Sequence, residues 1–378
     1  MKWETVRLGD VTDSCLGKML DQEKNKGEYQ PYLANLNVRW GYFELDNLSV
    51  MRFEKHEEDR YGLRYGDLIV CEGGEPGRCA IWKDIIPNMK IQKALHRVRV
   101  HDDLDYRFLY YWFLLAGKRG ALEQYFTGST IKHMPGDKLK SIIIEKPPLE
   151  TQKRIADILS AYDDLIENNQ KQIKLLEEAA QRLYKEWFVD LRFPDHEHTA
   201  IVDGVPEGWR KVNLEAIAPV LTGKKDANFG TSDGKYYFFT CGQEPIKAPS
   251  YSFDCEAVIL AGNGDFNVKL YRGQFEAYQR TYVFSPYSSK FLYLLYFSIV
   301  ENMRQLSNGA SGSTIKFLTK RMLEKITVIV PDGNNLAYFN KQCECYQRKK
   351  EALICQNKNL TEARDRLLPK LMSGEMEV

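Results

Sequence analysis

Two copies of one five-residue segment carry the side chains in this chain that are best suited to hold phosphate groups. Residues 128–132 and 312–316 both read Gly-Ser-Thr-Ile-Lys. Glycine allows a close backbone approach, serine and threonine hydroxyls donate hydrogen bonds to phosphate oxygens, and lysine supplies positive charge. The competing interpretation is a Ser/Thr-rich turn that caps a short helix. The candidate contacts are Gly128, Ser129, Thr130, Lys132, Gly312, Ser313, Thr314 and Lys316.

Other basic residues follow glycines and form a second set of candidates. Lys18 follows Gly17, Lys224 and Lys225 follow Gly223, and Arg78 ends the glycine-rich segment 73–78. Each could reach a phosphate or a base edge, and the alternative for each is a solvated loop cation. The aromatic runs 110–113 and 236–239 could stack on bases, but core packing is the favoured interpretation.

The residues needed for several enzyme chemistries are missing. A base methyltransferase needs an Asn/Asp-Pro-Pro-aromatic motif and a glycine-rich cofactor loop, and the sequence contains neither. It also lacks a Gly-x-x-x-x-Gly-Lys-Ser/Thr loop and a Cys-x-x-Cys zinc pair. The His-Glu-His segment 196–198 is interpreted as a solvated linker, and the acidic pairs 163–164 and 177–178 as a solvated helix face. We expect no catalytic residue, no metal and no cofactor.

Length and composition describe an ordinary soluble chain of two or three domains. There are 378 residues, with 53 basic and 52 acidic side chains and a net charge of +1. This balance does not exclude nucleic-acid binding, because a basic face can lie on a neutral chain. The best apolar run, 291–300, is too short for a membrane helix, which needs about 18 residues. Eight cysteines without paired spacing indicate reduced thiols, and we expect a cytoplasmic protein.

The chain contains one unit of roughly 180 residues twice. Trp3 and Gly17 reappear as Trp209 and Gly223, at an offset of 206. From the Gly-Ser-Thr-Ile-Lys segments onward the offset is 184, so the middle of the first copy is longer by 22 residues. The two middles also differ in sequence, so a repeated frame carries two divergent inserts.

Each unit begins with a mixed α/β part. The expected strands are 67–71, 94–100 and 141–145 in the first copy, and 257–261, 280–284 and 325–330 in the second. The expected helices are 106–115 and 290–300, and the expected loops are 72–77 and 262–267.

Each unit ends in a long amphipathic helix whose inward positions alternate four and three residues apart, a pattern typical of a coiled coil. The first seam consists of Ile155, Leu159, Tyr162, Ile166, Asn169, Ile173, Leu176, Ala180, Leu183 and Trp187. The second, poorer seam consists of Phe339, Cys343, Tyr346, Lys350, Leu353, Asn357, Leu360, Arg364, Leu367 and Leu371. Asn169 is expected to fix the register, and Pro369 to kink or end its helix near Leu368. Lys350 and Arg364 either extend to solvent or mark where a partner is met.

The expected fold is α/β (mixed α+β), with two domains separated by an antiparallel coiled coil of two long helices and a pseudo-twofold internal repeat. One amphipathic helix cannot bury its apolar stripe alone, so the two helices are expected to pack on each other. The boundaries are 1–146 for domain 1, 147–193 for helix 1, 194–206 for a linker, 207–332 for domain 2, and 333–378 for helix 2 with a C-terminal tail.

This pattern resembles the specificity subunit of type I restriction-modification systems over essentially the whole chain. The resemblance rests on the segment 146–155, Lys-Pro-Pro-Leu-Glu-Thr-Gln-Lys-Arg-Ile, on Trp209 with its Pro-Glu-Gly lead-in, and on the ending 367–375. The second copy departs from it after Pro331, where Asp-Gly-Asn-Asn replaces Pro-Leu-Glu-Thr.

The resemblance implies a non-catalytic subunit with two target-recognition domains, which read the halves of a split, asymmetric site in double-stranded DNA. It also implies two methyltransferase subunits and ATP-driven restriction subunits as partners, and no membrane. The candidate phosphate contacts then become candidate DNA contacts. The alternatives are a self-contained modification enzyme, disfavoured by the missing motifs, and a protein-binding coiled-coil scaffold, disfavoured by the divergent inserts.

Overall fold

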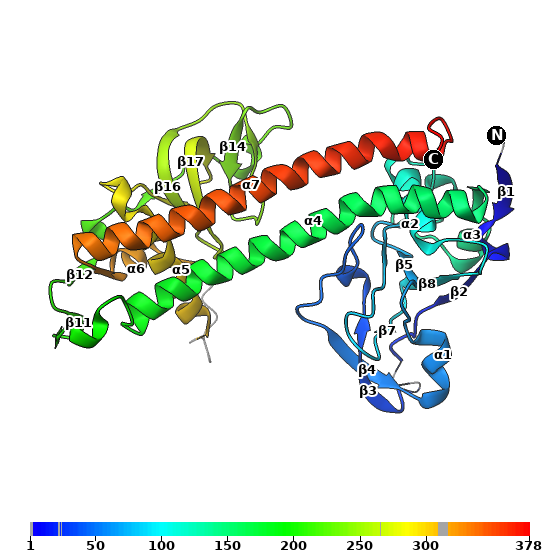
Figure 1. Ribbon diagram of the computed structural model, residues 1–378, viewed down its shortest axis with the longest axis horizontal. Helices are drawn as coiled ribbons and strands as arrows, with labels where there is room; N and C mark the ends of the chain where they lie inside the picture. The colour runs from blue at the N-terminus through cyan, green and yellow to red at the C-terminus, as the bar shows by residue number, and fades with distance from the viewer. Residues whose placement is uncertain (1–2, 22, 24, 265, 309–316) are drawn as a thin grey trace. The chain divides into compact units, whose positions relative to one another are not determined.

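The computed structural model describes residues 3–21, 23, 25–264, 266–308 and 317–378. The chain divides into two compact units, and Figure 1 shows the elements of both. Unit 1 comprises Met1–Asn169 with Cys355–Val378, and unit 2 comprises Gln170–Ile354. Each unit therefore contains one α/β domain and part of each long helix.

The domain of unit 1 is built on short, mostly antiparallel strands. Its four-stranded sheet has the order β2-β8-β5-β6, a three-stranded sheet has the order β4-β3-β7, and β1 pairs with β9. The strands are β1 (Glu4–Arg7), β2 (Thr12–Leu16), β3 (Glu28–Leu33), β4 (Ser49–Phe53), β5 (Leu68–Cys71), β6 (Cys79–Ile81), β7 (Lys90–Ile91), β8 (Leu95–Val100) and β9 (Ile143–Lys146). The α-helices of the domain are α1 (Glu58–Tyr61), α2 (Tyr106–Lys118) and α3 (Gly136–Lys140).

The domain of unit 2 joins the equivalent strands into one sheet. Its order is β13-β18-β16-β17-β14-β15, and β12 pairs with β19. The strands are β10 (Ile201–Val202), β11 (Val205–Pro206), β12 (Arg210–Asn213), β13 (Leu221–Thr222), β14 (Tyr236–Phe239), β15 (Ile246–Ala248), β16 (Phe253–Ala261), β17 (Val268–Ala277), β18 (Thr281–Phe284) and β19 (Thr327–Val330). The α-helices of the domain are α5 (Leu292–Asn308) and α6 (Lys320–Glu324).

The repeat in the sequence is a repeat in strand register. Glu4 pairs with Lys146 in unit 1, and Arg210 pairs with Val330 in unit 2, so both sequence offsets hold across one ladder. The long strand β17 of unit 2 corresponds to two short strands, β6 and β7, in unit 1. The first copy thus has two short strands and two sheets where the second copy has one long strand and one sheet.

The two long helices are α4 (Leu149–Tyr184), which continues as a π-helical segment Lys185–Val189, and α7 (Gly333–Met372). Within unit 1 the amide of Asn169 donates to that of Asn357 at 2.8 Å, and within unit 2 Lys350 pairs with Glu177 at 2.6 Å. A second contact in each unit, Asp163 with Arg364 in unit 1 and Trp187 with Tyr338 in unit 2, shows that the two segments run antiparallel, as expected. All the expected seam residues of both helices are buried or half-buried.

Pro369 is expected to kink or end the second helix near Leu368. The helix does not end there, so that part of the prediction is wrong. The helix α7 continues to Met372 with Pro369 inside it. Leu368, Leu371 and Met372 are all buried in the core of unit 1. Packing of this last turn offsets the hydrogen bond that proline removes.

Lys350 and Arg364, the charged residues of the second seam, do not extend to solvent, and they contact α4 and not another protein. Lys350 pairs with Glu177 on α4, and the Arg364 guanidinium pairs with Asp163 on α4. Asp163 is therefore half-buried, which corrects the expectation of a solvated face for this residue, whereas Asp164, Glu177 and Glu178 are exposed as expected. These ion pairs lie along the side-by-side helices of each unit.

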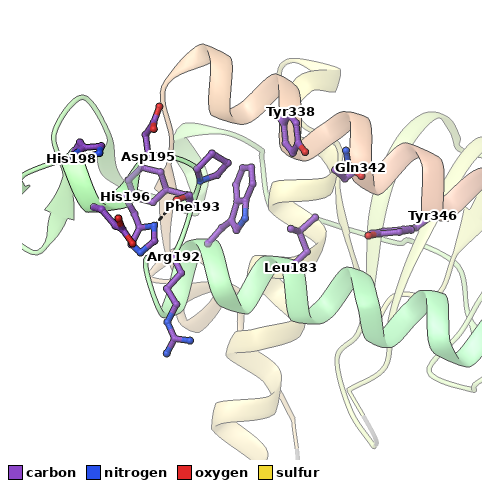
Figure 2. Close-up of a pocket in the computed structure, with 12 residues that line it drawn as sticks. Leu183, Arg192, Phe193, Asp195, His196, His198, Tyr338, Gln342 and Tyr346 are labelled. Carbon is purple, nitrogen blue, oxygen red and sulfur yellow. Dashed lines mark hydrogen bonds between the residues drawn. The ribbon is translucent and has the colours of Figure 1, made fainter.

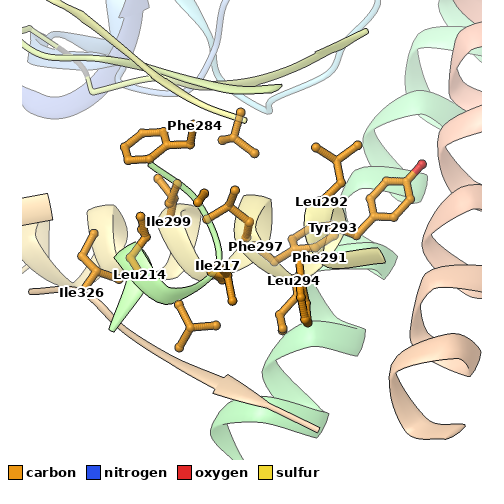
Figure 3. Packing of buried hydrophobic residues seen from close by; sticks show 14 of the residues in the cluster. Leu214, Ile217, Phe284, Phe291, Leu292, Tyr293, Leu294, Phe297, Ile299 and Ile326 are labelled. Atoms are coloured by element: carbon orange, nitrogen blue, oxygen red, sulfur yellow. The ribbon is translucent and has the colours of Figure 1, made fainter. Parts of the chain in front are cut away.

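The large core of unit 2 lies between the sheet and α5 (Figure 3). Leu292 and Leu294 of the helix are buried together with Phe284 of the sheet. Trp209, the repeated tryptophan, packs on Phe193 with ring centroids 4.4 Å apart. The end of the first long-helix segment, just before the linker, is thus packed against the domain that follows.

Candidate nucleic-acid interface

The first Gly-Ser-Thr-Ile-Lys segment is an exposed loop closed at its base. Thr127 and His133 exchange both backbone hydrogen bonds, at 2.8 and 2.9 Å, and residues 128–132 between them are exposed. Gly128 has φ +88°, and a Cβ there would lie 2.3 Å from the Ile131 carbonyl oxygen. Any other residue at this position would be strained. The sequence therefore specifies the loop shape as well as its polar surface.

The alternative of a helix-capping turn does not describe this loop. The next helix, α3, begins at Gly136 with Pro135 as its N-cap, and it has no side-chain cap hydrogen bond. Lys132 lies 3.7 Å from Glu123, a loose and exposed ion pair that costs little to break. The loop can therefore present its hydroxyls and ammonium group to a ligand.

The equivalent anchor is present in unit 2. The backbone N–H of Met134 donates to the carbonyl of Glu72 at 2.7 Å, and Leu318 donates likewise to Gly262 at 2.8 Å. His133 and Phe317 form the matching bridges to Gly73 and Asn263. The second segment itself, with Gly312, Ser313, Thr314 and Lys316, lies outside the described residues.

Lys18 is neither an exposed phosphate contact nor a solvated loop lysine, which corrects both expectations. Its side chain is 4% exposed, and its ammonium group lies 2.5 Å from Glu57 and 3.0 Å from the Arg52 carbonyl. It also lies over the Phe53 ring, 5.1 Å from the centroid. Its charge is already neutralised inside the domain, so we leave it out of the DNA-contacting set.

Lys225, and not Lys224, occupies the equivalent position in unit 2. Lys18 and Lys225 form equivalent parallel bridges, to Gln92 and to Tyr278. The Lys225 ammonium group lies 4.4 Å from the Phe229 ring centroid and remains half-buried, whereas Lys224 is exposed. Lys224 is an extra residue after Gly223, so the structural equivalent of Lys18 lies one position later than the sequence match predicts.

Arg78 is held by its own domain. Its guanidinium donates to the Asn35 side chain at 3.0 Å and pairs with Glu75 at 3.1 Å, and its side chain is only 16% exposed. Glu75 also accepts a hydrogen bond from the Trp40 indole at 2.6 Å. This arrangement fixes the glycine-rich loop beside His133, and it leaves little of Arg78 for a base edge.

Core packing accounts for most of the two aromatic runs, as favoured. Tyr110, Tyr111 and Phe113 are buried, as are Phe238 and Phe239. Tyr237 differs, because it is 39% exposed whereas Phe238 and Phe239 of the same strand are buried.

A pair of carboxylate sites, which the sequence patterns did not predict, joins each domain to the helices of its own unit. In unit 1 the Tyr111 hydroxyl donates to Asp163 at 2.6 Å, and Arg364 pairs with the same carboxylate. In unit 2 the Tyr293 hydroxyl donates to Glu344 at 2.6 Å, and Arg272 pairs with it at 3.0 Å. Each domain is thereby held on its helices by a phenol, a guanidinium and one carboxylate.

The electrostatics of the second site follow from these contacts. The hydrogen bonds from Arg272 and then from Tyr293 lower the pKa of Glu344 to about 2. Burial, together with the hydrogen bond to Glu344, raises the pKa of Tyr293. At neutral pH the pair is therefore an ionised carboxylate and a neutral phenol.

An aromatic pocket of about 620 Å³ lies at the linker of unit 2 (Figure 2). Trp187 and Tyr338 stack there with ring centroids 5.7 Å apart, and the His196 ring forms a hydrogen bond with the Phe193 carbonyl at 2.9 Å.

His196, Glu197 and His198 are exposed, and the described residues contain no cluster of three metal-binding side chains. Nor does any helix in the described ranges have the length and apolarity to cross a membrane.

The fold and its candidate sites define a duplicated α/β protein in which each domain docks on paired, antiparallel helix segments. The chain belongs to the family of the type I restriction modification DNA specificity domain, whose model matches residues 1–178 and 206–349.

Relatives agree with this family, and a solved structure has a similar fold. The chain is 41% identical over 127 residues to the EcoDI specificity subunit of Escherichia coli, and 30% identical over 231 residues to the MjaVIII specificity subunit of Methanocaldococcus jannaschii. These matches cover 34% and 59% of this chain, but only 28% and 50% of the two relatives. A type I restriction-modification S subunit from M. genitalium has a similar fold, with TM-score 0.58, 18% identity, and coverage of 98% of this chain and 96% of that one.

Proposed function

We propose that this chain is a non-catalytic DNA-specificity subunit that reads a bipartite, asymmetric site in double-stranded DNA. The observation that carries the proposal is one frame, with identical register in β1–β9 and β12–β19, holding two inserts of different sequence and strand layout. Equivalent scaffolds with different surfaces suit two half-sites of different sequence. Direct readout of base edges by each insert would make the site non-palindromic.

The proposed partners are two methyltransferase subunits and the restriction subunits, which carry the chemistry on other chains. This chain would need no cofactor of its own. Residues 1–146 and 207–332 are proposed as the two target-recognition domains, and the paired helices as the spacer.

Within the domains, the exposed loop 128–132 is proposed to contact the DNA backbone. Ser129, Thr130 and Lys132 supply the donors, and Gly128 permits the tight loop. The second copy, including Gly312, Ser313, Thr314 and Lys316, is proposed for the same role because its sequence is identical. Lys224 is a further exposed candidate, whereas Lys18 and Arg78 serve the domain interior.

The test is base-modification sequencing of a host genome with and without this gene. A specificity subunit gives methylation at one bipartite, asymmetric motif, and the signal disappears on deletion. An unchanged methylation pattern would contradict the proposed function.

Two binding measurements separate the alternatives. The purified chain is titrated with the methyl-donor cofactor, since binding would support a self-contained enzyme. The chain with its methyltransferase partner is titrated with random duplex DNA at several salt concentrations. A specificity subunit gives salt-sensitive binding with selectivity for one sequence, whereas a scaffold gives no selectivity.

A further inference from the structure

The two divergent inserts place the same kind of hairpin at the same position of the frame. In unit 1, β3 pairs antiparallel with β4 and parallel with β7. In unit 2, β14 pairs antiparallel with β15 and parallel with β17. The backbone N–H groups of Gln92 and Tyr278 donate to Leu33 and Phe239, at 3.0 and 2.9 Å, which fixes the equivalence.

The two faces of each hairpin differ, because one face carries buried apolar residues and the other carries an exposed tyrosine, Tyr29 or Tyr237. Met51 and Phe53 are buried on the first hairpin, and Phe238 and Ala248 on the second. The residues of the opposite face alternate with these along the strands. Because both strands of each hairpin lie within the divergent inserts, the exposed faces belong to the inserts and not to the repeated frame.

On the first hairpin a cation lies over an exposed aromatic ring. Tyr29 and Arg52 are directly paired across the strands, and the guanidinium carbon is 4.8 Å from the ring centroid. Tyr29 is 64% exposed, and the adjacent pair on this face is Pro31 and Val50.

The second hairpin repeats this chemistry with different residues. Tyr237 and Lys247 are directly paired, and the ammonium nitrogen is 4.0 Å from the ring centroid. The Tyr237 ring makes an edge-to-face contact with the Tyr271 ring of β17, with 5.7 Å between the centroids. Lys235 is exposed just before this strand, two residues from Tyr237.

The charges of these faces favour an anionic ligand. Among the described residues, Lys18 and Arg78 are matched by Glu57 and Glu75, whereas Arg52 and Lys247 form cation–aromatic contacts and no ion pair. The paired positions on the two exposed faces include no acidic residue. A cross-strand pair contributes little to the stability of a hairpin, which leaves the cations available for binding.

We propose that the exposed faces of the β3–β4 and β14–β15 hairpins enter the major groove of the DNA duplex, one in each half-site. Arg52 and Lys247 donate to base-edge acceptors, and Tyr29 and Tyr237 orient them. The major groove admits a two-stranded β-ribbon, and Arg or Lys with the acceptors of guanine is the commonest specific contact there. This inference rests on the proposed DNA-recognition function and adds which residues read the bases.

The experiment uses the chain assembled with its methyltransferase subunits and a library of duplexes randomised at each half-site. The variants are Arg52→Ala, Arg52→Lys, Lys247→Ala and Tyr237→Ala. The matched controls are Arg64→Ala and Lys211→Ala, two exposed cations of the domains that lie away from the hairpin faces. Methylated sequences are read out for both halves of the site, and circular dichroism melting checks that each variant is folded.

Arg52→Ala is expected to relax the base preference at one position of one half-site, by roughly tenfold or more, and Lys247→Ala to do so in the other half-site only. Arg52→Lys is expected to relax the first half-site partly, because lysine cannot make the bidentate contact. Folded variants that keep the wild-type preference overturn this inference, as does a uniform loss of affinity without a change in preference. A wild-type complex without sequence selectivity would instead overturn the proposed function, so the two failures are distinguishable.

Discussion

At the scale of single residues, burial decides which cations can meet a ligand. Lys18 and Lys225 occupy equivalent positions in the two domains, yet Lys18 lies beside Glu57 and Lys225 over Phe229. A sequence shows that a lysine follows a glycine, but it does not show that a carboxylate 39 positions away will neutralise it. The exposed loop 128–132 followed from local residue types, whereas the fate of Lys18 depended on tertiary contacts.

Lys18→Met is expected to destabilise the chain by about 1–3 kcal/mol, because it leaves the half-buried carboxylate of Glu57 without its ammonium partner. The free energy of unfolding is measured by urea denaturation. The control is Lys224→Met, an exposed lysine whose replacement is expected to change stability by less than about 0.5 kcal/mol. Equal effects of the two substitutions would show that the Lys18 pair is not stabilising.

The stability of unit 2 is expected to depend on the ionisation of Glu344. Its pKa of about 2 is below the ordinary glutamate value of 4.5, so it stabilises the fold at neutral pH and this contribution is lost as the pH falls through that interval. The free energy of unfolding, followed from pH 6 to about pH 2, should fall less steeply for Glu344→Gln than for the wild type. Glu351→Gln, on the same helix, is the control and should follow the wild-type curve.

At the scale of elements, the repeated frame could be predicted and the inserts could not. The strands β9 and β19, the central strands and the long helices have apolar patterns that occur twice, so the sequence predicts them. The strands β1 and β12 are not predicted as strands, and only their repeated residues mark them. The strands β3, β4, β14 and β15 are short, and Pro31 interrupts the pattern of the first. The strand β17 follows a loop-like segment and contains Gly273 at φ +122°, a residue that usually argues against a strand.

The hydrogen-bonded amides of Asn169 and Asn357 are expected to fix the register of the long helices and to lower the stability of the seam. Asn169→Leu is expected to cost about 1–3 kcal/mol, because Asn357 loses its partner while remaining half-buried. The double variant with Asn357→Leu should recover much of this stability, since two apolar residues can pack in the seam. The free energies of unfolding of both variants and the wild type are compared by urea denaturation. A double variant no more stable than the single one would contradict this account of the pair.

At the scale of the whole molecule, the two domains are expected to act independently in choosing the target. Replacing residues 207–332 with the equivalent segment of a relative should change one half of the methylated motif and leave the other half unaltered. Base-modification sequencing measures both halves in the same sample. Replacing residues 1–146 is the reciprocal control and should alter the opposite half, whereas a change in both halves would contradict independent reading.

The paired strands at the two ends of each domain have a consequence for inheritance. Because β1 pairs with β9, and β12 with β19, the chain enters and leaves each domain through one two-stranded ribbon. A stretch of gene encoding everything between the two strands can therefore be exchanged by recombination while the ribbon and the long helices stay the same. Under the proposed function, a population could acquire new DNA targets in this way, one half-site at a time, without any change to the paired helices.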